Sequence, residues 1–152
     1  MRDSIGGVFN LTFIAVFMLV VSGYLAFSVS YNKAYKVKNK IISTLEQYEG
    51  YNSKSKEVIE NYMDKLGYNA GEVASNLKSD YNCCSNRGYC VQWVSDDSAD
   101  SGLPRGYYKV LTTVNIDVPI FNKFLPFMTF FKTTGDTMTI YTSDPTATSS
   151  CN

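Results

Sequence analysis

The stretch Leu11-Thr-Phe-Ile-Ala-Val-Phe-Met-Leu-Val-Val-Ser-Gly-Tyr-Leu-Ala-Phe27 decides how the rest of this 152-residue chain is interpreted. It lies inside a longer run, from Asp3 to Lys33, that has no charged side chain between its two ends. About 20 apolar residues are enough for a helix to cross the hydrocarbon core of a bilayer. A helix also satisfies its backbone hydrogen bonds internally, which lipid requires. We therefore predict a transmembrane helix over residues 8–31.

A cleaved secretory signal is the alternative interpretation. Arg2 is a minimal basic n-region, and Ala26-Phe27-Ser28 resembles a small-x-small cleavage site. The apolar stretch is, however, longer than the h-region of about 7 to 15 residues that is usual for a signal peptide. We favour an anchor that is retained.

The helical pattern continues beyond the apolar run, over residues 32–50. Apolar side chains recur every three or four residues and so share one face of a helix. A single helix from Ile5 to Tyr48 would be about 65 Å long at 1.5 Å per residue. Gly50 is a plausible C-terminal stop. The apolar positions are Ala34, Val37, Ile41, Ile42, Leu45 and Tyr48, with lysines at positions 33, 36, 38 and 40 between them.

Small residues recur at every fourth position of this helix, at Ser22, Ala26, Ser30 and Ala34. Such a line lets a neighbouring helix approach closely in a membrane, which predicts self-assembly or a partner helix. Small residues are also common in membrane helices, so coincidence is the alternative. The tyrosines at positions 24, 31 and 35 suit an aromatic belt at the membrane interface.

Composition limits the classes of function for the remaining residues. The 14 basic and 14 acidic residues balance, which gives no electrostatic reason to expect a nucleic-acid partner. Histidine is absent, which disfavours a catalytic triad or a catalytic zinc site. No nucleophile motif, phosphate-binding loop or carboxylate pair stands out. We predict no catalytic residues, no cofactor and no metal ion, and we expect membrane lipid as a partner.

Four cysteines, Cys83, Cys84, Cys90 and Cys151, suggest disulfides in an oxidising compartment. No C-x-x-C pair supports a metal site. We expect Cys83 or Cys84 to pair with Cys90, and the other to pair with Cys151.

The lysines that follow the apolar run favour a cytoplasmic domain under the positive-inside rule. Because the cysteines argue for an oxidising compartment, we expect residues 51–152 to form an extracytoplasmic domain.

This domain has the pattern of an α+β fold. One helix is predicted by the helical spacing from Val58 to Leu66 and ends at Gly67. A further short helix is predicted to follow, because Asn69 with Glu72 resembles a capping box. Its inner face would consist of Ala70, Val73, Ala74 and Leu77. We then predict a small antiparallel sheet of about four strands. The first strand starts near Tyr89, and the second runs over 107–118 with one buried side. The third and fourth strands run over 129–134 and 137–142 and flank a hairpin turn at Gly135-Asp136.

Two connections stand out. Residues 96–102 form an acidic cluster that is better explained as a solvated hairpin loop than as a calcium loop, because the glycine and the closing glutamate of that motif are missing. Residues 119–131 carry too many large apolar groups for a free loop, including Phe121, Phe124 and Phe127. They either pack against the long helix or touch lipid or a neighbouring subunit.

The whole arrangement, together with Gly6-Gly7-Val8-Phe9-Asn10-Leu11-Thr12-Phe13, resembles the type IV pilin-like family and more closely its TadE-like pseudopilin branch of tight-adherence pilus systems. The resemblance implies that a prepilin peptidase cuts after Gly7, which makes residues 1–7 a leader and Val8 the first mature residue. It also implies partners among pilin-like subunits or membrane assembly proteins. The fifth mature residue, usually glutamate, is Thr12 here, which implies a minor, tip or initiating role, or an uncut anchor. The alternative is a single-pass ectodomain that acts as a binding or regulatory module outside any filament.

Overall fold

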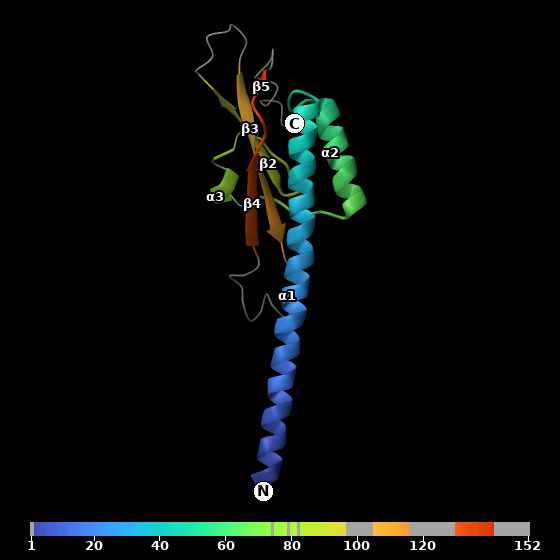
Figure 1. Ribbon diagram of the computed structural model, residues 1–152, viewed down its shortest axis with the longest axis vertical. Coiled ribbons are helices and arrows are strands. Elements are labelled where there is room, and N and C mark those ends of the chain that lie inside the picture. Colours follow the sequence, from blue (N-terminus) through green and yellow to red (C-terminus); the bar gives the residue numbers. More distant parts are fainter. Residues whose placement is uncertain are drawn as a thin grey trace.

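The computed structural model describes residues 2–73, 75–78, 80–81, 83–96, 105–115 and 130–141. One very long helix carries a compact head, in which a second helix and an antiparallel sheet pack around the upper half of the long helix (Figure 1). The predicted α+β class is confirmed. In chain order the elements are α1 (Arg2–Gln47), α2 (Ser53–Leu66), α3 (Ser75–Lys78), β1 (Cys83–Cys84), β2 (Tyr89–Ser95), β3 (Arg105–Asn115), β4 (Phe130–Asp136) and β5 (Ile140–Tyr141).

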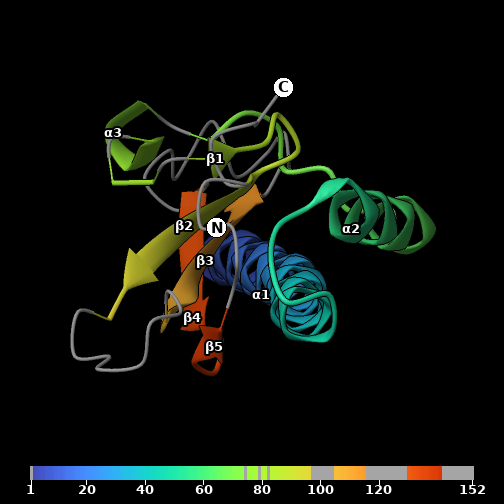
Figure 2. The same ribbon diagram turned by 90° about the horizontal axis from the view of Figure 1, so that it is seen from above.

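Helix α1 is continuous over 46 residues, or roughly 70 Å at 1.5 Å per residue. Its lower half projects from the head as a stem, and its upper half lies between the sheet and α2 (Figures 1 and 2). The predicted apolar stripe is confirmed, because four of its members are fully buried and Ile42 packs against them. The buried members are Ala34, Val37, Ile41 and Leu45.

Helix α2 starts and ends at well-formed caps. The Asn52 side chain accepts a hydrogen bond from Ser55 N at 2.9 Å, and Ser55 Oγ accepts one from Asn52 N at 2.8 Å, which closes a capping box. Gly67 ends the helix in the left-handed conformation at φ 62°, as the sequence predicts. Ile59 and Met63 face the core.

The predicted helix that starts at Asn69 is wrong in its position and length. Of the described residues in this segment, only Ser75–Lys78 is helical. Asn69 Oδ1 instead accepts a hydrogen bond from Gly71 N at 3.1 Å, and Gly71 has a φ of 73°. A local side-chain turn therefore competes successfully with helix initiation, as asparagine favours.

The sheet is antiparallel with the order β1-β2-β3-β4, and β3 is the central strand. Leu111 pairs with Cys90 on one side and with Thr134 on the other. The predicted strands near Tyr89 and over the first part of 107–118 are confirmed, while residues 116–118 lie outside the described residues.

The predicted hairpin at Gly135-Asp136 is wrong. Both residues belong to β4, where Gly135 pairs with Val110, and β5 pairs with a different part of β3 through Ile140 and Gly106. The two segments therefore lie one after the other along the same edge of β3. Gly135 permits a close approach rather than a turn, because an added Cβ would lie 2.9 Å from Ile42 Cδ1 of α1.

The prediction that β3 buries only one side is also wrong. Tyr108, Val110 and Val114 face α1, but Leu111 and Thr113 on the opposite side are buried as well. The segment that includes α3 covers this second face, on the far side of the sheet from α1 (Figure 2). Its buried cluster consists of Val73, Cys90 and Leu111, with Leu77, Tyr81 and Cys84 packed against it.

Candidate functional site

The largest exposed feature of the described residues is the apolar stem. Val8 is 68% exposed, Leu11 70% and Phe17 66%. Such a surface is far too apolar for water and requires lipid or an apolar partner. By length and composition, α1 is the one helix among the described residues that could cross a membrane.

Two hydroxyl groups in the stem are satisfied within the helix. Thr12 Oγ1 donates to Val8 O at 2.9 Å, and Ser22 Oγ donates to Met18 O at 2.7 Å. Backbone carbonyls four residues earlier are the usual acceptors for such hydroxyl groups in membrane helices. Neither residue therefore leaves an unpaired hydroxyl hydrogen on the apolar surface of the stem.

The predicted processing position lies inside the unbroken helix. Gly7 is helical, and apart from its own helix backbone and chain neighbours no atom lies within 4 Å of a Cβ built on it, while Val8 is exposed. Cleavage after Gly7 stays a prediction.

The predicted line of small residues is divided between two environments. Ser22 is exposed, Ala26 and Ser30 are half-buried, and Ala34 is completely buried. The carbonyl of Ala34 accepts a hydrogen bond from Thr112 Oγ1 at 3.4 Å. The upper end of the line is therefore occupied by the protein's own sheet, and only its lower part is open to a partner helix.

An aromatic contact joins the stem to the base of the head. The rings of Phe27 in α1 and Phe131 in β4 meet edge to face, with 4.9 Å between their centroids. Phe131 is a member of the apolar connection that we expected to pack on the long helix or to touch lipid or a subunit. Its described contact is with the helix. The other candidates, Phe121, Phe124 and Phe127, lie outside the described residues.

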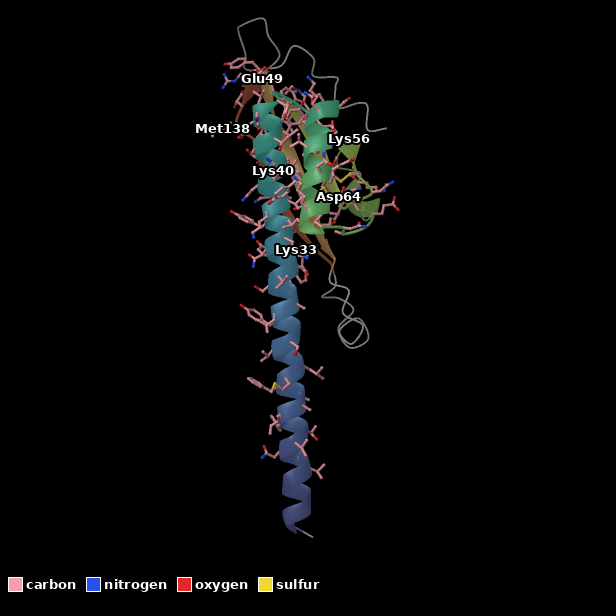
Figure 3. The ribbon with its side chains drawn as sticks, turned by 90° about the vertical axis from the view of Figure 1, so that its right-hand side faces the viewer. Lys33, Lys40, Glu49, Lys56, Asp64 and Met138 are labelled. Atoms are coloured by element: carbon pink, nitrogen blue, oxygen red, sulfur yellow. A yellow bond between two sulfur atoms is a disulfide. The ribbon has the colours of Figure 1, made fainter. Side chains whose placement is uncertain are left out.

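Directly above this contact is a concave pocket of about 120 Å³, which we call the stem–head notch. The chain that leaves α2 crosses α1 here, at the lower end of the head (Figure 1). Lys33 lies at the level where α2 ends (Figure 3). The notch is lined by Ser30, Lys33, Gly67, Tyr68, Asn69, Ala70 and Val114.

Tyr68 forms the rigid wall of the notch. Its hydroxyl group donates toward the carbonyls of Gly88, at 3.2 Å, and of Thr113. Burial raises the pKa of Tyr68 to about 12, although the contact with Thr113 lowers it. The phenol is therefore neutral at physiological pH and acts as a structural anchor.

A disulfide joins Cys84 to Cys90 across the paired strands β1 and β2, with 4.0 Å between the Cα atoms. This is one of the two pairings predicted for Cys90. Cys83 is also disulfide-bonded, and its predicted partner Cys151 lies outside the described residues.

A second, wider depression of about 400 Å³ lies between α2 and the turn that this disulfide closes. Buried Tyr51 and Tyr89 share a hydrogen bond between their hydroxyl oxygens at 3.0 Å, and desolvation raises the pKa of both. At the rim, Arg87 pairs with Asp64 at 2.5 Å. The depression is lined by Tyr51, Lys56, Glu60, Cys83, Cys84, Ser85, Asn86 and Arg87, so its charges are mixed and select no obvious ligand.

Within the described ranges, no three side chains of the types His, Cys, Asp or Glu come together in a way that could hold a metal ion. Comparisons of the chain with protein-family models, with curated proteins and with solved structures found no match.

The stem–head notch was not predicted from the sequence. From the sequence, Ser30 was interpreted as a small residue for helix packing, and Lys33 as the end of the apolar run and one of the lysines that follow it. Tyr68 and Asn69 reach them only through the chain reversal after Gly67. Lys33 at the boundary of the span was the one usable signal, because a lysine there commonly extends toward lipid headgroups.

Proposed function

We propose that this protein is a membrane-anchored, pilin-like surface protein with a structural or assembly role in a pilus-like system. The observation that carries the proposal is the continuity of α1. The same helix provides an exposed apolar stem and, through Val37, Ile41 and Leu45, the buried centre of the head. The first half suits lipid or a bundle of similar helices, and the second half fixes the head to it.

Rigid mounting supports an assembly role. The sheet packs along α1, and Phe27 and Phe131 close the lower end of that contact. A head attached in this way keeps one orientation relative to its stem. Packing stems side by side would therefore place successive heads in a regular arrangement, which a head on a flexible linker would not achieve.

The disulfide supports an extracytoplasmic head. Disulfides form and persist in oxidising compartments and are rare in the cytosol. Cys90 is fully buried and Cys84 half-buried, so their bond is part of the head's packing.

Thr12 directs the proposal toward a minor, tip or initiating subunit, or toward an uncut anchor. In the pilin-like family the glutamate at this position is thought to pair with the amino group of the adjoining subunit. Thr12 carries no charge, and its hydroxyl group donates to Val8 O of the same helix. It can offer an incoming amino group only a neutral oxygen, which binds a cation more weakly than a carboxylate does.

A second candidate function is a single-pass binding module outside any filament. The burial of Ala34 against the protein's own sheet favours it, because this shortens the surface available to a partner helix. The depression between α2 and the disulfide-closed turn would then be the natural place for a ligand.

Two measurements on the protein in its native cell test the proposal. Amino-terminal sequencing asks whether the mature chain starts at Val8, and cysteine labelling from outside, with and without reductant, asks where the head lies. Assembly is tested by oxidative cross-linking of Ser22→Cys, with Val20→Cys on the opposite face of the stem as the matched control. Both positions are exposed.

The assembly proposal expects cross-linked dimers from Ser22→Cys in clear excess over Val20→Cys. Equal and weak cross-linking, in a protein whose head is labelled from outside, would favour the binding module. Free thiols on the cytoplasmic side would contradict both candidates.

A further inference from the structure

We propose that the stem–head notch binds the phosphate group of an anionic membrane lipid, with Lys33 as the cationic partner. This inference goes beyond assembly and rests only on the anchoring part of the proposed function, namely that α1 spans the membrane. Its basis is the position of the notch, its unpaired donors and its size.

The notch lies at the height of the lipid headgroups. Within the predicted membrane segment 8–31, the twenty residues from Val8 to Phe27 are enough to span the hydrocarbon core of about 30 Å, which leaves residues 28–31 for the headgroup layer. Ser30 and Lys33 follow at about 4.5 and 9 Å along the axis. The headgroup layer extends several ångströms beyond the core on each side. Ser30 therefore lies within the headgroup layer, and Lys33 lies just beyond its outer edge, from which its long side chain can extend back to the lipid phosphates.

Donors without partners line the notch. Lys33 takes part in none of the three ion pairs found among the described residues, and no described hydrogen bond involves its ammonium group or the Ser30 hydroxyl. Because Asn69 Oδ1 already accepts from Gly71 N, the Asn69 amide group has its two N–H donors left for a ligand. A cation with several neutral donors is the donor set that phosphate oxygens require.

Negative groups near the notch are already occupied. The end of α2 would offer carbonyl oxygens, but Asp64 O accepts from Gly67 N at 3.1 Å and Met63 O accepts from Tyr68 N at 3.0 Å. The carboxylate of Asp64 pairs with Arg87. These two carbonyl oxygens and the Asp64 carboxylate are thus engaged within the protein, while the side chains of Lys33, Ser30 and Asn69 offer donors to a ligand.

The volume of the notch suits one small polar group. About 120 Å³ accommodates a phosphate or a few water molecules, but not the acyl part of a lipid. The acyl chains would remain alongside the stem, where α1 is apolar. Tyr68, fixed by its hydrogen bonds to Gly88 and Thr113, prevents the notch from collapsing.

The test uses the full-length protein in uncharged detergent micelles and counts bound lipid by native mass spectrometry. The lipids are phosphatidylglycerol and phosphatidylcholine in competition, and inorganic phosphate is the soluble probe. We expect one phosphatidylglycerol to be retained per chain in preference to phosphatidylcholine. Lys33→Gln should weaken its binding about tenfold, as expected for the loss of a hydrogen bond to a charged group.

Lys36→Gln is the matched control, because Lys36 is exposed, lies one helical turn further along α1 and does not line the notch. It removes the same charge from the same region and should change binding less than about twofold. Ser30→Ala should weaken binding about threefold to fivefold through a neutral hydrogen bond. It keeps the proposal testable if Lys33→Gln fails to fold, and Lys33→Arg should retain binding.

Equal losses for Lys33→Gln and Lys36→Gln would overturn the proposal in favour of diffuse attraction to an anionic surface. Displacement of the lipid by inorganic phosphate at the same concentration would show a soluble phosphate site instead. Binding of both lipids alike would also overturn it. Because purified monomers are used, any of these results leaves the assembly proposal standing. A chain that is extracted from membranes without detergent would instead contradict the premise that both proposals share, namely that α1 spans the membrane.

Discussion

Phe27 of the stem and Phe131 of the sheet meet edge to face, with ring centroids 4.9 Å apart. This contact joins the last part of the uncharged run to the first part of β4, which is more than one hundred positions later in the chain. The head therefore begins where the apolar stem ends, and only a short part of α1 separates the two.

We first predict that Phe131→Ala destabilises the head by about 1 to 3 kcal/mol, through lost burial of a half-buried ring and a lost aromatic pair. Phe27→Ala should have a similar effect in the same detergent, and the double variant should cost less than the sum of the two. Phe13→Ala is the control, because its ring contacts Phe9 within the stem at 5.3 Å. Denaturant unfolding followed by Trp93 fluorescence measures all four variants, and additive effects would contradict a direct contact.

The second prediction concerns the bond between Cys84 and Cys90. The double variant Cys84→Ala, Cys90→Ala should lower the free energy of unfolding by about 2 kcal/mol, because a short loop in the unfolded chain is no longer closed. Alanine avoids placing a hydroxyl group at the fully buried position 90. Unfolding in denaturant measures the change, and an unaltered midpoint would show that strand pairing alone holds β1.

Local patterns in the sequence were sufficient for α1, the end of α2, and strands β2 and β3. The charge-free run and the apolar spacing of Val37, Ile41 and Leu45 depend on neighbours within the helix itself, which sequence periodicity reports directly. Gly67 was predictable for the same reason, because a helix cap is determined by a few adjacent residues.

The failed predictions concern residues whose surroundings come from distant parts of the chain. Gly135 has the composition of a turn, but its role is set by Ile42 of α1, which is not visible locally. Thr113 looks like a surface residue of an alternating strand, yet its hydroxyl donates to Gly88 O at 3.0 Å on the second covered face. The stem–head notch was missed for the same reason, because it forms only when the chain after Gly67 reaches α1.

A third prediction separates two glycines with positive φ. Gly88 has a φ of 90°, and an added Cβ would lie 2.6 Å from Ala70 Cβ and 2.7 Å from Thr113 Oγ1. Gly88→Ala should therefore destabilise the head by at least about 2 kcal/mol, through backbone strain and overpacking together. Gly67→Ala has open space around its Cβ and should cost only about 1 kcal/mol. Equal losses in thermal unfolding would mean that packing at Gly88 contributes nothing.

A fourth prediction concerns Thr137, which lies between β4 and β5. Its hydroxyl oxygen accepts from Tyr108 N at 2.9 Å, and its own N–H donates to Tyr108 O at 3.0 Å. Thr137→Val keeps the shape but leaves a buried N–H without its acceptor, so it should cost about 1 to 3 kcal/mol. Thr137→Ser keeps the hydroxyl group and should recover most of that loss in the same denaturant measurement. Similar stability for the valine and serine variants would show that water replaces the hydroxyl group.

The last prediction is a loss of stability at high pH that arises in part from Tyr68. Its pKa is raised by burial from 10 in the unfolded chain to about 12 in the folded protein. The unfolded chain therefore releases this proton first, and the stabilisation is complete below pH 10 and is lost as pH rises through about 12. Between these pH values, the free energy of unfolding of the wild type should fall by about 2 to 3 kcal/mol more than that of Tyr68→Phe, as measured in denaturant titrations at successive pH values. Tyrosinate absorbance checks that ionisation accompanies unfolding. Identical pH profiles for the two proteins would show that Tyr68 ionises in the folded head at its ordinary pKa, and that its contacts with Gly88 and Thr113 do not select the neutral phenol.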